Sequence, residues 1–94
     1  MVTHKTVGMV ELSAVAEELK AKGGQSEMAR VLKAKGAPVL QASISSWCRG
    51  ESRPTPVLRA VLRRVFGIAE EHWLTAKEQR LLDRVTARTS AEAA

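Results

Sequence analysis

Apolar residues recur along this chain with the period of an α-helix and are interrupted by glycine and proline. Between residues 10 and 22, Leu12, Val15 and Leu19 fall three or four positions apart, with charged residues between them. This pattern predicts an amphipathic helix with one buried stripe, which ends before the glycine pair at residues 23–24. Residues 1–9 lack the pattern, so we expect a flexible N-terminal arm there.

Two more helices are predicted on either side of Gly36 and Pro38. The first covers about residues 25–35, and the second follows Pro38 with an apolar face formed by Ile44, Trp47 and Cys48. Two helices joined by a glycine-containing turn make up a helix-turn-helix unit. The remaining faces of the second helix carry a set of small or polar side chains: Gln41, Ala42, Ser43, Ser45, Ser46 and Arg49.

Three further helices are predicted toward the C-terminus. Thr55 and Pro56 are typical of a helix start, and Gly67 ends that helix. Residues 69–74 form a short fifth helix, and Thr75 to Glu78 spells a capping box that opens a sixth. After Ala87 the tail is expected to fray. The predicted fold class is therefore all-α: a compact five-helix domain over residues 10–74, followed by a C-terminal helix and tail over residues 75–94.

Composition limits the setting of this domain. Ninety-four residues correspond to a single domain, and one cysteine, Cys48, excludes an internal disulfide. No apolar run approaches the roughly 20 residues that a membrane helix requires. We therefore expect a cytoplasmic protein that does not enter a membrane.

Positive charge is concentrated in the middle of the chain. Residues 30–64 contain eight basic residues and one acidic residue, whereas the rest of the chain contains seven basic and nine acidic residues. A solvated face with no partner usually mixes its signs, so this asymmetry favours a polyanionic partner such as nucleic acid.

The polar residues on the second helix of the predicted helix-turn-helix unit are of the types that can bind DNA bases. Glutamine can bond adenine with two hydrogen bonds, arginine can do the same with guanine, and serine can donate or accept at several base edges. By contrast, the sequence contains no recognisable nucleophile with its base, no phosphate-binding glycine loop and no metal-ligand spacing around His72. We therefore expect no enzyme activity, no cofactor and no bound metal.

An ordered set of residues between about Val10 and Leu74 carries a family resemblance: Gln25, Ala29, Arg30, Leu32, Ile44, Ser45, Trp47, Arg49, Gly50, Pro54 or Pro56, Leu58, Leu62, Gly67, Ile68, Trp73 and Leu74. In this combination the chain resembles the helix-turn-helix domains of the phage lambda-repressor and Cro type. The resemblance implies a third helix that lies in the major groove.

Carried over by position, the resemblance implies a role for each exposed residue. Gln25 would contact a phosphate, Gln41, Ala42 and Ser46 would face base edges, Ser43 and Ser45 would touch bases or phosphates, and Arg49 and Arg53 would lie on the backbone. The segment between Leu32 and Ile44 is about five residues longer than is usual in the family. Either the preceding helix or the loop is extended. If Ser43 caps the following helix, Gln41 moves into the loop, and Ser45, Ser46 and Arg49 become the main readers.

These observations favour a sequence-specific transcriptional regulator that binds double-stranded DNA as a homodimer, with the C-terminal helix as the predicted dimer contact. An alternative is a protein-binding helical module of the antitoxin or adaptor kind, which would have a protein partner. A second alternative is an architectural or recombination factor that bends DNA.

Overall fold

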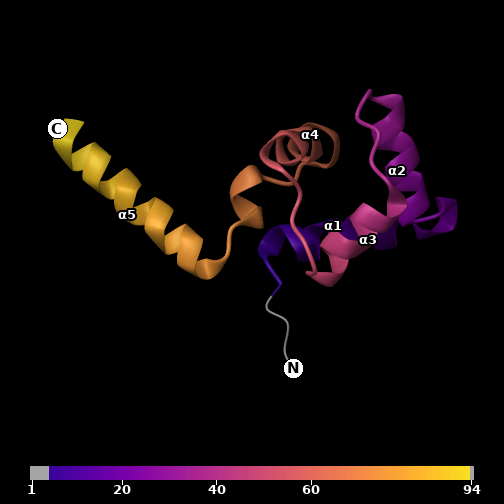
Figure 1. The fold of residues 1–94 in the computed structure, drawn as a ribbon, viewed down its shortest axis with the longest axis horizontal. Helices are drawn as coiled ribbons and strands as arrows, with labels where there is room; N and C mark the ends of the chain where they lie inside the picture. The colour runs from indigo at the N-terminus through magenta and orange to yellow at the C-terminus, as the bar shows by residue number, and fades with distance from the viewer. Residues whose placement is uncertain (1–4, 94) are drawn as a thin grey trace.

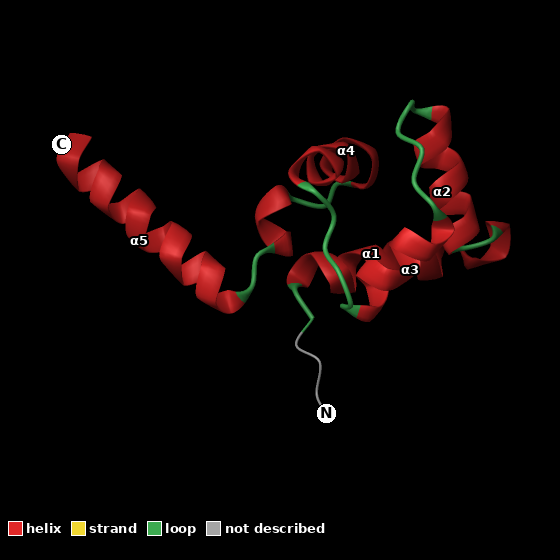
Figure 2. Cartoon of the chain, viewed as in Figure 1, coloured by secondary structure: helices red, strands yellow, loops and turns green. Residues whose placement is uncertain are grey.

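The computed structural model describes residues 5–93, with side chains as far as residue 88. This part of the chain contains no strand and folds into five α-helices and two short 3₁₀ helices (Figures 1 and 2). They are α1 (Val7–Glu18), η1 (Lys20–Lys22), α2 (Gln25–Ala34), α3 (Gln41–Arg49), α4 (Pro56–Phe66), η2 (Glu70–Trp73) and α5 (Ala76–Ala93). The all-α prediction is confirmed, but five α-helices are found where six were predicted.

Helix α1 begins inside the segment that was expected to be a flexible arm. The Thr6 hydroxyl accepts a hydrogen bond from the backbone N–H of Met9 at 3.4 Å, which caps the first turn. Gly8 and Met9 are buried, and Gly8 lies against the indole of Trp73. The predicted arm is therefore wrong for residues 7–9, because a contact with a distant tryptophan orders them. Residues 1–4 of that arm lie outside the described residues.

The four helices α1, α2, α3 and α4 and the turn η2 share a single core and form one compact body. Helix α1 packs on both α3 and η2, α2 packs on α3, and α4 packs on η2. The core that these helices bury is mainly aliphatic but also contains two tryptophans and one cysteine. Its members are Met9, Leu12, Met28, Leu32, Ile44, Trp47, Cys48, Leu62, Ile68 and Trp73. Because α3 contributes three of these residues, the core determines which of its faces points outward.

Two of the predicted α-helical segments are single 3₁₀ turns. Helix α1 ends at Glu18 rather than near Lys22, and the chain turns through η1 to Gly23, whose φ of 118° suits glycine. The predicted fifth helix is η2, a four-residue 3₁₀ turn that Trp73 anchors in the core. Both segments are too short to repay the cost of nucleating an α-helix.

Helix α5 extends away from the body (Figure 1). Its capping box forms as predicted, since the Thr75 N–H donates to Glu78 Oε1 at 2.8 Å and the Glu78 N–H donates to Thr75 Oγ1 at 3.2 Å. The helix continues to Ala93, so the tail predicted to fray after Ala87 is helical; its alanine, arginine and glutamate are good helix formers. The radius of gyration, 15.2 Å, exceeds the roughly 12 Å of a fully compact chain of this length.

Candidate nucleic-acid interface

Helices α2 and α3 form the two-helix unit that the sequence predicted, with an enlarged junction. Helix α2 ends at Ala34, and residues 35–40 are not helical. Gly36 has a φ of 86°, which a glycine adopts easily, and the chain then runs extended through Pro38 to α3. The extra length between Leu32 and Ile44 therefore lies mainly in the loop and not in an extended α2.

The start of α3 decides which side chains face outward. Leu40 occupies the N-cap position, and the backbone N–H of Ser43 donates to the Leu40 carbonyl at 3.0 Å, so Ser43 lies inside the helix. The alternative in which Ser43 caps a later helix is wrong. Gln41 and Ala42 consequently occupy the first turn of α3, where both are exposed.

The core fixes the rotation of α3 about its own axis. Ile44, Trp47 and Cys48 are at most 6% exposed and form its inner face, as their spacing predicted. The half-buried side chains of Ser43, Ser45 and Ser46 and the exposed side chain of Arg49 occupy the other faces. All six residues proposed from the sequence on α3 are therefore accessible to a partner.

A side-chain hydrogen bond connects the start of α2 to the start of α3. The Ser26 hydroxyl donates to Gln41 Oε1 at 3.0 Å, although the two residues come from different helices. An amide oxygen has two lone pairs, so this bond leaves Gln41 with one acceptor position and its NH₂ donors. Ser26 thus orients Gln41 without using up its capacity to bond a base. Gln25, which precedes Ser26 at the start of α2, is half-buried.

The second half of α3 is tied to the loop that follows it. Arg49 holds the Glu51 carboxylate with two bonds, from Nε at 2.9 Å and from Nη2 at 3.0 Å, and its Nη1 donates to the Ser45 hydroxyl. The hydroxyls of Ser46 and Ser52 share a bond of 2.7 Å. The hydrogen bonds from Arg49 lower the pKa of Glu51, and Glu51 in turn raises the pKa of Arg49.

Arg53, which is expected from the sequence to lie on the DNA backbone, is exposed and also makes two contacts within the chain. Its Nη1 donates to the carbonyl of Trp73 at 3.2 Å and to the carboxylate of Glu78 in the first turn of α5. This bond, together with the Thr75 backbone N–H, lowers the pKa of Glu78 to about 2. Arg53 therefore joins the loop after α3 to both η2 and α5.

Two residues on this surface were not identified from the sequence. Ser26 follows Gln25 directly, so its place in the first turn of α2 was visible, but its bond to Gln41 depends on how the helices pack. Leu40 has no polar side-chain group that would mark it as a contact in the sequence, yet its side chain is 75% exposed beside Gln41. Isolated apolar side chains on a surface are common, so only the position of Leu40 makes it relevant to this surface.

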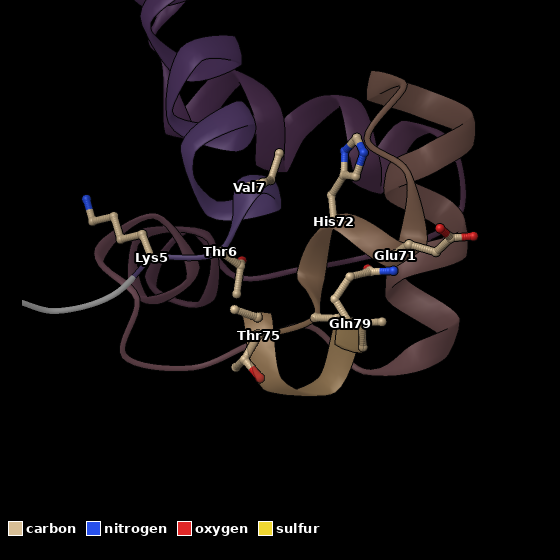
Figure 3. A pocket seen from close by; sticks show the side chains of 9 residues that line it. Lys5, Thr6, Val7, Glu71, His72, Thr75 and Gln79 are labelled. Atoms are coloured by element: carbon tan, nitrogen blue, oxygen red, sulfur yellow. The ribbon is translucent and has the colours of Figure 1, made fainter. Parts of the chain in front are cut away.

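One pocket lies away from these residues. It has a volume of about 400 Å³ and is lined by the segment before α1, by η2 and by the first turn of α5 (Figure 3). His72, one of its lining residues, contacts the Glu11 carboxylate through Nδ1. Among the side chains that the structure describes, no group has the arrangement of a metal site. None of the residues proposed on α3 lines this pocket.

Comparison with protein-family models, with curated proteins and with solved structures found no match. No helix in the described part of the chain combines the length and apolar character needed to cross a membrane.

Proposed function

We propose that this protein is a sequence-specific DNA-binding transcriptional regulator of the lambda-repressor and Cro type, in which α3 reads the major groove. The observation that carries this proposal is the Ser26–Gln41 bond. It holds an exposed glutamine in the first turn of a helix whose outer face is accessible, in a stretch of chain with a strong excess of positive charge. An oriented amide costs less conformational entropy when it binds a base than a freely rotating one.

In this arrangement the first turn of α3 supplies base contacts of two kinds. Gln41 bonds an adenine through its NH₂ group and its remaining lone pair. Leu40 and Ala42, both exposed on either side of it, offer apolar surface to the 5-methyl group of thymine. The proposed site therefore prefers A·T pairs opposite the start of α3.

The phosphate contacts are assigned to the flanks of α3. Gln25 at the start of α2 and Ser45 and Ser46 on α3 are accessible for such contacts. Arg49 uses three of its five N–H donors on Glu51 and Ser45, so it can hold a phosphate with its Nε–Nη2 pair of donors only after the Glu51 carboxylate has left. Glu51 therefore weakens the attraction of Arg49 for any DNA backbone and favours duplexes that also supply base contacts.

Selection from a pool of random duplexes, followed by fluorescence anisotropy, tests this proposal. We expect an enriched motif, and at near-physiological salt we expect the selected duplex to bind at least about 10³-fold more tightly than a scrambled one. Affinity for both should fall as salt rises, because phosphate contacts release counterions. Equal affinity for the two duplexes would reject sequence-specific readout.

A protein-binding role is the second candidate, and exposed apolar residues on α5 favour it. Leu81 is 58% exposed and Leu82 is 37% exposed, on a helix that projects from the body. The partner would be a second copy of the chain, which would give the two-fold dimer that palindromic operators favour, or an unrelated protein. Analytical ultracentrifugation of the wild type and of Leu81→Ser tests the homodimer. A monomeric wild type would remove the dimer from the proposal.

A further inference from the structure

Four cations form a row along α5 that the proposed reading of the major groove does not use. Lys77, Arg80, Arg84 and Arg88 follow one another at intervals of three or four residues and are all exposed. Because an α-helix turns by about 100° per residue, the four Cα positions fall within an arc of about 80°. They extend along about 16 Å of the helix axis. We call this set the α5 cation row.

Among the described side chains, the α5 cation row has no acidic partner to neutralise it. Glu78 points to Arg53, and Asp83 accepts a hydrogen bond from Gln79 at 3.0 Å. As far as residue 88, no carboxylate forms an ion pair with any member of the row. A shallow depression of about 420 Å³ lies among the first three members, Lys77, Arg80 and Arg84, and is also lined by Glu78 and Leu81.

Such a row costs the helix stability when nothing binds it. Arg80 and Arg84 are four residues apart, and so are Arg84 and Arg88, and like charges at this spacing repel on a helix surface. A helix that projects from the body has little tertiary packing to offset that repulsion. A polyanion along the row would remove the repulsion and add attraction.

The arginines nearer α3 are less available than those of α5. Arg49 is held by Glu51, and Arg53 is held by Glu78 and by the Trp73 carbonyl. Arg53 also fixes the first turn of α5 beside the loop that follows α3. The start of the α5 cation row is therefore attached to the proposed DNA-binding surface, and the row extends outward from it.

We infer that the α5 cation row is a second nucleic-acid contact, which binds the phosphate backbone of duplex DNA outside the base pairs that α3 reads. This inference rests on the proposed function, because it takes the duplex as the partner. An anionic membrane surface fits less well: the apolar flank of α5 consists of a few aliphatic residues with no aromatic residue, whereas helices that lie in a membrane surface carry a broad apolar face.

The double variant Arg84→Gln/Arg88→Gln tests the inference. Each phosphate contact contributes about 0.9 to the slope of log affinity against log salt, so losing two contacts should lower the slope by about 1.8. At 0.1 M salt the affinity should fall at least about tenfold, equally for selected and scrambled duplexes. The control is Arg63→Gln/Arg64→Gln on α4, which removes the same charge and should leave the slope unchanged. Circular dichroism confirms that both variants keep their helices, and glutamine is a good helix former.

The outcomes separate this inference from the proposed function. A steep salt slope that neither double variant changes, or that both lower equally, overturns the inference and leaves sequence-specific binding intact. The same result together with capture of the wild type on anionic phospholipid vesicles would assign the row to a membrane surface. No binding of the wild type to any duplex would overturn the proposed function and this inference with it.

Discussion

Replacing Gly8 by alanine tests the contact that orders the N-terminus and positions η2. A Cβ at Gly8 would lie 2.7 Å from Cδ2 of Trp73, 2.9 Å from Cε2 and 3.0 Å from Cε3. Ordinary contacts of this kind are 3.4 to 4 Å long, so the ring or α1 must move by several tenths of an ångström. Trp73 is 0% exposed, which means that the indole can only move against other core residues.

Two opposing effects determine the size of the change. Alanine favours a helix over glycine by at most about 1 kcal/mol, and by less in the first turn, where Gly8 lies. Overpacking a well-filled core costs about 1–3 kcal/mol. The clash should prevail, so we expect Gly8→Ala to lower the free energy of unfolding by about 1–2 kcal/mol. For a domain of this size, each kcal/mol lowers the Tm by about 4–8 °C.

Thermal and urea unfolding, followed by circular dichroism and tryptophan fluorescence, measures this change. The matched control is Ala14→Gly, an exposed position on the same helix, which reports the propensity difference without a clash. A Gly8→Ala protein that is as stable as the wild type, or more stable, would show that Trp73 does not lie against Gly8. It would also leave the early start of α1 without a physical cause.

Three further predictions concern α5 and the surface of α3. The pKa of Glu78 is lowered to about 2, so the stabilisation that this carboxylate gives to the attachment of α5 should be complete above about pH 4.5 and lost as the pH falls toward 2. Helicity measured over this pH range should therefore change more in the wild type than in Glu78→Gln. Identical curves for the two proteins would contradict this. If Leu40 contacts a thymine methyl group, replacing that thymine by deoxyuracil should lower the affinity of the wild type for the duplex about fourfold. The affinity of Leu40→Ala should not change. Glu51→Gln should free Arg49 and raise affinity for scrambled duplexes by a few fold, whereas unchanged affinity would argue against competition between Glu51 and phosphate.

Local signals in the sequence predicted much of the fold. Pro56 occupies the first position of α4, as predicted, although the Thr55 side chain makes no capping bond. Thr75 and Glu78 form the capping box of α5. Both signals are local, because they depend on residues within one turn of each other. The start of α1 could not be predicted in this way. It depends on Trp73 meeting Gly8, and no local pattern carries that contact.

In the candidate site, too, features that depend on local spacing could be predicted from the sequence, and features that depend on contacts between distant residues could not. The spacing of Ile44, Trp47 and Cys48 predicted the inner face of α3, and with it the exposed set. The sequence leaves open whether Ser43 caps α3, and the structure places Leu40 at the N-cap position instead. Arg53 shows the limit of such reasoning: its position in the loop predicts a phosphate contact, but no local pattern predicts its bond to Glu78, 25 residues away.

The most direct test of the central claim uses Gln41→Ala on the duplex obtained by selection, with every base pair changed singly. When the A·T pair that Gln41 contacts is replaced, the wild type should lose about 1–3 kcal/mol of binding free energy. The variant should bind the original and the altered duplex equally well. Ala14→Ser, on an exposed face of α1, serves as the unrelated control and should discriminate like the wild type. If Gln41→Ala still discriminates at every base pair as the wild type does, Gln41 does not read DNA, and the observation that carries the proposed function fails.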